Sequence, residues 1–90
     1  MTHNELWMGI RNLAAEFNIS CSRLAVISGL NPTTFNPSKY TTHNGHPRWL
    51  STYSISRVLD ATGLTLKEFA QFLPSDTHEF AKYDFNKKKR

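Results

Sequence analysis

The sequence has little cysteine and no long hydrophobic run. Its single cysteine, Cys21, cannot form an internal disulfide. The sequence does not open on a charged and then apolar leader, and no apolar stretch approaches the length that spans a membrane. We therefore expect a protein of a reducing cytoplasm that is not associated with a membrane.

Motifs for catalysis and ligand binding are also scarce. The sequence has no G-x-S-x-G elbow and no glycine-rich phosphate loop, and its Ser, His and Asp residues are scattered among expected caps and loops. His43, His46 and Cys21 lack the fourth ligand and the close pairing that structural zinc requires. We expect neither an enzyme nor catalytic residues, and no cofactor, metal site or small-molecule ligand.

Acidic residues are missing from the middle of the chain. From residue 17 to residue 59 there is no Asp or Glu, whereas the same stretch holds Arg23, Lys39, Arg48 and Arg57. Of the eleven Lys and Arg in the chain, four form the terminal KKKR, which leaves seven against seven Asp and Glu. The uneven distribution predicts a positive field over the central segment, as phosphate binding requires.

Caps and periodicity predict helices on both sides of this segment. Thr2 and Glu5 have capping-box spacing, and the helix behind them is expected to end at Asn18. Its inner face is the stripe Leu6, Ile10, Leu13 and Phe17. Trp7 lies off this stripe and is expected to widen the core.

Two further helices are expected after the central segment. Ser51 or Thr52 begins a helix that Gly63 ends. The pair 65 and 68, Thr and Glu, has capping-box spacing, and Pro74 stops the last helix.

The stretch from 21 to 40 has the spacing of a helix-turn-helix. Leu24, Ala25 and Ser28 lie on one face of a first helix, where the small Ala25 lets another helix cross closely. Gly29 can adopt the positive φ of a tight turn. A second helix is expected to follow.

That second helix should begin at Asn31, a good N-cap, with Pro32 at the first helical position. Phe35 should point back at the first helix. Pro37 lacks an N–H and disfavours helical geometry in the residue before it, so we expect the helix to bend or end near Asn36.

The outward side chains of this second helix are short hydrogen-bonding groups and one cation. Such groups can read bases: Asn pairs with adenine, Thr bonds or packs on thymine, and Lys reaches guanine. The expected base contacts are Thr33, Thr34, Asn36, Ser38 and Lys39.

The segment from 40 to 50 reads as a loop, because it contains Asn-Gly and His-Pro and has no helical period. Trp49 is expected to be its buried anchor. In helix-turn-helix domains, the segment after the recognition helix runs beside the DNA backbone, and the N-terminus of the following helix lies nearby. The expected phosphate contacts are Ser22, Arg23, Thr42, Arg48, Ser51 and Thr52.

Three runs carry a family resemblance: LAAEFNIS at 13–20, NPTTFNPSK at 31–39, and PRW at 47–49. With Ala25 and Gly29 between the first two, they resemble the DNA-binding domain of XRE/Cro transcriptional regulators. They resemble in particular the N-terminal domains of phage repressors that carry a LexA-like peptidase of the S24 type. The resemblance covers about residues 5 to 73.

The resemblance implies a compact, all-α, five-helix lambda-repressor-like domain over 1–74, followed by a linker and basic tail over 75–90. It implies a sequence-specific repressor of phage or mobile-element type that occupies an operator on double-stranded DNA as a homodimer. The protein would be cytoplasmic and associated with the bacterial nucleoid. The alternative is a protein-interaction module on the same fold, an adaptor or antitoxin-like inhibitor without a DNA site of its own.

Overall fold

The computed structural model describes residues 1–74, so the expected linker and basic tail lie outside the described residues. The first helix, α1 (His3–Glu16), begins where its capping box predicts. Thr2 Oγ1 accepts a hydrogen bond from the Glu5 amide at 3.1 Å, and Glu5 Oε1 accepts one from the Thr2 amide at 2.7 Å. Asn18 ends the helix at a positive φ of 58°, which asparagine tolerates better than most residues.

The two C-terminal helices begin as predicted, but the second ends at Ala70, four residues before Pro74, which was expected to stop it. Ser51 is the N-cap of α3 (Thr52–Thr62), and Gly63 ends that helix in the left-handed region. A capping box over 65–68 precedes the short α4 (Leu66–Ala70). These boundaries were predictable because each depends on side chains within one turn of the helix end.

The second half of the expected helix-turn-helix differs from the prediction. α2 (Cys21–Ile27) forms and Gly29 turns the chain at a φ of 75°. In place of an α-helix, residues 32–35 then form a turn, and a 3-10 helix, η1, covers Pro37–Lys39. Pro37 cannot donate to the carbonyl four residues earlier, and Asn36 before it is extended, with φ −66° and ψ 146°.

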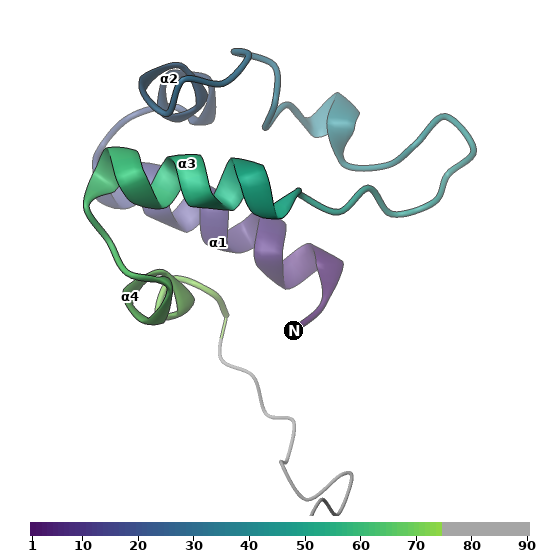
Figure 1. Cartoon of the computed structure of the whole chain (residues 1–90). Coiled ribbons are helices and arrows are strands. Elements are labelled where there is room, and N and C mark those ends of the chain that lie inside the picture. The colour runs from purple at the N-terminus through teal and green to yellow at the C-terminus, as the bar shows by residue number, and fades with distance from the viewer. Residues whose placement is uncertain (75–90) are drawn as a thin grey trace, which may run out of the picture.

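Residues 1–74 therefore form a compact all-α domain with four α-helices rather than five. The missing helix is the expected second helix of the helix-turn-helix, and η1 lies in its place. In the view of Figure 1, α3 lies in front of α1, with α2 above these two helices and α4 below them. The core joins all of them and is made of Leu6, Trp7, Ile10, Leu13, Ala14, Leu24, Ala25, Phe35, Val58 and Phe69. No helix in this part of the chain combines the length and apolar character needed to cross a membrane.

Of the two tryptophans, Trp7 lies in the core as expected and Trp49 does not. Trp49 is 51% exposed, so the prediction that it is a buried anchor was wrong. Trp7 is 2% exposed and anchors the loop instead, because its indole Nε1 donates to the main-chain carbonyl of Arg48 at 3.0 Å. The loop lacks regular structure except for an isolated bridge between Thr41 and Pro47, and it projects beyond the helices in Figure 1.

Candidate nucleic-acid interface

The turn after α2 is held by the side chain of Asn31. Its Oδ1 accepts hydrogen bonds from the Thr33 amide at 2.9 Å and from Thr33 Oγ1 at 2.7 Å. Thr34 Oγ1 donates to the Asn31 carbonyl at 2.6 Å. Both threonine hydroxyls thus donate their hydrogen bond within the turn. They keep free lone pairs, which suits them to accept from a base amino group, and methyls that can pack on thymine.

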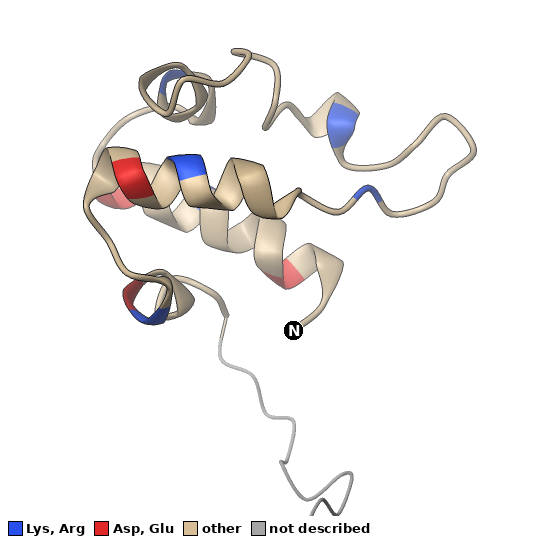
Figure 2. Cartoon of the chain, viewed as in Figure 1, with Lys and Arg blue, Asp and Glu red and all other residues tan. Residues whose placement is uncertain are grey.

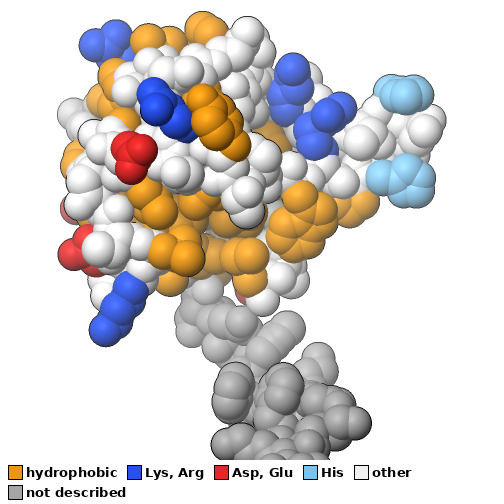
Figure 3. Space-filling model, in the orientation of Figure 1, with side chains coloured by type: hydrophobic (Ala, Val, Ile, Leu, Met, Phe, Trp, Pro, Cys, Tyr) orange, Lys and Arg blue, Asp and Glu red, His pale blue; other side chains and the backbone are white. Residues whose placement is uncertain are grey.

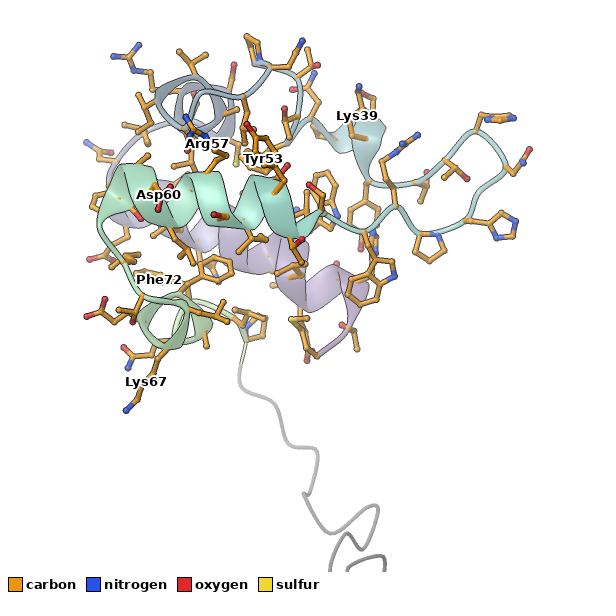
Figure 4. The ribbon with its side chains drawn as sticks, viewed as in Figure 1. Lys39, Tyr53, Arg57, Asp60, Lys67 and Phe72 are labelled. Carbon is orange, nitrogen blue, oxygen red and sulfur yellow. The ribbon has the colours of Figure 1, made fainter. Side chains whose placement is uncertain are left out.

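The other expected base contacts divide into exposed and half-buried residues. Ser38 and Lys39 are exposed on η1, and Lys39 points away from the helices (Figure 4). Asn36 is half-buried at the N-cap of η1, where its side chain makes no capping bond. It lines a cavity of about 400 Å³ together with Trp7 and Phe35. Ser38 and Lys39 are therefore better placed to reach a ligand than Asn36.

The loop after η1 is folded on itself and tied to α1. Thr42 Oγ1 accepts from the His46 amide at 3.2 Å, and the Thr42 amide donates to the His46 carbonyl at 2.8 Å. The Tyr40 carbonyl accepts from the Arg48 amide at 3.0 Å and from His3 Nε2 at 2.8 Å. Since a carbonyl only accepts, His3 carries a proton on Nε2. These bonds fix the backbone of Arg48 and leave its side chain exposed.

The remaining expected phosphate contacts lie at the starts of α2 and α3. Ser22 and Arg23 are exposed in the first turn of α2. Ser51 is used as a cap, because its Oγ accepts from the Ser54 amide at 3.0 Å and donates to Ser54 Oγ at 3.1 Å. Thr52 is exposed beside it. A phosphate here would meet the hydroxyl of Thr52 and main-chain N–H groups of the first turn.

Two residues of α3, Tyr53 and Arg57, belong to the same region. Tyr53 is exposed and lies one turn before Arg57, and both project from α3 toward the α2 side (Figure 4). Their spacing of four residues places them on one helix face. Arg57 is also engaged within the domain, because its Nε donates to the Ser28 carbonyl at 3.0 Å.

Charge is separated across the domain. The basic residues of α2, η1, the loop and α3 lie along one edge, whereas the acidic residues lie on α1, α4 and the far end of α3 (Figure 2). The division is incomplete, because Asp60 follows Arg57 by one turn on α3 and Lys67 adjoins Glu68 on α4. Figure 3 shows basic and acidic side chains next to each other on the left of the view. We call this edge the cationic edge and define it by Arg23, Lys39, Arg48 and Arg57.

Cys21 is half-buried on α2. Burial raises the pKa of its thiol, and the nearby charge of Arg11 opposes this in part. A raised pKa keeps the thiol protonated and weakly nucleophilic at neutral pH. Within residues 1–74, no three His, Cys, Asp or Glu side chains come together as a metal would require.

Comparisons with known proteins add nothing to this description: no protein-family model matches the chain, and no curated protein or solved structure matches it significantly.

Proposed function

We propose that the chain is a sequence-specific DNA-binding transcriptional regulator of the XRE/Cro type, with a helix-turn-helix over 21–40 in a lambda-repressor-like domain. The observation that carries the proposal is the cationic edge. Arg23, Lys39 and Arg48 are exposed along it, and the chain from residue 17 to residue 59 contains no acid. Duplex DNA is a dense array of negative charge, and an unopposed row of cations is the surface that it attracts.

Within this proposal, the segment from Thr33 to Lys39 reads bases. Ser38 and Lys39 are exposed and free of capping duties, and Thr33 offers an acceptor and a methyl group. A turn followed by a 3-10 helix is shorter than a recognition helix, so few base pairs are read directly. The rest of the affinity comes from phosphate contacts by Arg23 of α2 and by Thr42 and Arg48 of the folded loop.

We further propose that the protein acts as a homodimer in the bacterial cytoplasm. One small domain reads a short half-site and binds weakly, whereas two linked copies raise the affinity through effective concentration. Bound across an operator that overlaps a promoter, the dimer would exclude polymerase sterically. The half-sites should lie about one helical turn apart, roughly 10 base pairs between centres.

Selection from a pool of random duplex DNA at moderate salt tests this function. A two-fold-symmetric motif should emerge with the native chain. Ser38→Ala should relax the preference at one base position, because it removes a base contact. Arg48→Ala should weaken binding to all sequences alike, because it removes a phosphate contact. Recovery of random sequence would overturn the proposal.

A second function, a protein-interaction module on this fold, is favoured by one observation. Between α2 and α3, where a recognition helix would lie, the chain forms only the 3-10 helix η1 and no α-helix that could enter a major groove. An interface with a protein would respond weakly to salt, whereas binding through several phosphates falls by orders of magnitude between about 50 and about 200 mM salt. A salt-insensitive complex would therefore assign the chain to this second function.

A further inference from the structure

A groove with apolar walls lies between α3 and α4, and Trp49 of the loop also lines it. It has a volume of about 620 Å³. Its walls include Leu50, Ile55, Leu59, Leu66, Phe69 and Leu73. Figure 3 shows hydrophobic side chains gathered between these two helices on the face toward the viewer. The volume is in the range of pockets that enclose a drug-sized molecule, which is larger than one aromatic side chain.

The groove exposes residues that small domains usually cover. Leu66 is 64% exposed on α4, and Trp49, which also lines the groove, is 51% exposed. Contiguous exposed apolar surface of this kind marks a place where something docks. Leaving this apolar surface in water lowers the stability of the fold, and a domain of this size has only a small core to offset the loss.

The chain itself carries a suitable occupant. Leu73 lines the groove, and the polypeptide continues directly from it into residues 75–90. That stretch contains three aromatic residues within six positions, Phe80, Tyr83 and Phe85. Phe80 follows Leu73 by seven residues, a distance of about 25 Å at full extension. A short connector therefore suffices to return these aromatic side chains to the groove beside which the chain leaves α4.

We propose that the segment from Phe80 to Phe85 docks in the groove between α3 and α4 of its own chain. Aromatic side chains bury about 150–250 Å² each, so they would cover the exposed part of Leu66 and of Trp49. The connection to α4 keeps the segment at a high effective concentration, which favours this occupant over a second copy. The inference is independent of DNA binding.

A nitroxide spin label on the full chain tests this docking. Cys21→Ser with Lys82→Cys places the label between the aromatic residues, and it broadens the NMR signals of groups near it. In the labelled chain, the methyl signals of Leu59 and Leu66 should lose most of their intensity. Val26, exposed on α2, is the matched control and should keep its signal. Full intensity at Leu59 and Leu66 would overturn the proposal.

Two further samples identify the occupant. Mixing unlabelled, isotope-enriched chain with spin-labelled chain at natural isotope abundance reports contacts between copies alone, so no broadening is expected there. Broadening in this mixture would assign the groove to a second copy and overturn the proposal. Replacing the three aromatic residues of the segment with serine, or Leu66 with glutamate, should restore the signals of Leu59 in the labelled chain. Persistent broadening in both variants would also contradict the docking.

Discussion

Arg57 of α3 donates a hydrogen bond from Nε to the main-chain carbonyl of Ser28 at 3.0 Å. Ser28 is the C-cap of α2, where carbonyls lack partners within the helix and the helix dipole is negative. The guanidinium therefore completes the end of α2 and holds α3 beside the turn at Gly29. We call this contact the Arg57 clamp.

Loss of the clamp should destabilise the domain. Arg57→Leu removes a charged donor from a half-buried carbonyl and should lower the free energy of unfolding by about 1–2 kcal/mol. Urea unfolding followed by circular dichroism measures this change. Arg23→Leu is the control, because Arg23 is exposed on α2 and should change stability by less than about 0.5 kcal/mol. Equal losses in the two variants would show that the clamp contributes nothing.

Two features disfavour a side chain at Gly29: its positive φ and the nearby guanidinium of Arg57. Its φ is 75°, and a Cβ added there would lie 2.5 Å from Arg57 Nη2. Gly63 has a similar φ of 73° but nothing within 4 Å of an added Cβ. Alanine at either position should cost about 1 kcal/mol for the left-handed backbone, with a further loss at Gly29 alone.

Unfolding of the two alanine variants, each with and without Arg57→Leu, separates these terms. The excess loss at Gly29 should shrink when the arginine is already removed, because the two changes then share one cause. If the two glycine positions responded alike in both backgrounds, the steric part of this account would be wrong.

The two tryptophans should respond very differently to phenylalanine. Trp7→Phe removes the hydrogen bond to the Arg48 carbonyl and leaves space in the core, so it should cost about 1–3 kcal/mol. Trp49→Phe should cost less than about 1 kcal/mol, because Trp49 is half-exposed. Thermal unfolding of both variants checks this order, and a larger loss at Trp49 would reverse the assignment of the anchor.

The parts of the fold that were predictable from the sequence are those set within one helical turn. The caps at Thr2, Ser51 and Thr65 and the turns at Gly29 and Gly63 all formed where expected. Each depends on a side chain bonding to an amide two or three residues away, or on a backbone angle that glycine favours. Neither requires knowledge of the rest of the chain.

The features that could not be predicted depend on contacts between distant segments. Trp7 was expected in the core, but its hydrogen bond to the loop and the exposure of Trp49 depend on how the loop returns to α1. The Arg57 clamp likewise joins groups 29 residues apart. The replacement of a helix by η1 was foreseen in part, since Pro37 was expected to disturb it, but the competing Asn31 turn was not.

The alkylation of Cys21 should report its buried position. Because burial raises the pKa of the thiol, the folded protein holds less thiolate at a given pH and should react with iodoacetamide more slowly than urea-unfolded chain. The rate should keep rising beyond the pH at which the unfolded thiol has titrated. The preference for the protonated thiol adds stability at low pH, and this contribution is lost as the pH rises through the folded-state pKa.

Arg11→Gln tests the cause of this behaviour. Arg11 lowers the pKa of Cys21 through its charge, so its removal should raise that pKa further and slow alkylation of the folded protein. Rates measured between about pH 7 and about pH 10 locate the titration in both proteins. A faster reaction after Arg11→Gln would mean that Arg11 blocks access to the thiol rather than lowering its pKa.

The salt dependence of DNA binding by Lys39→Gln and Lys67→Gln tests the proposed function most directly. Both lysines are exposed, but Lys39 lies on the cationic edge and Lys67 lies on α4 on the other side of the domain (Figure 4). Removing one phosphate contact should reduce the slope of log affinity against log salt by about one per protomer. We predict this reduction for Lys39→Gln and an unchanged slope for Lys67→Gln. Equal slopes in the two variants, or an affinity that does not change with salt concentration, would contradict a DNA interface on the cationic edge.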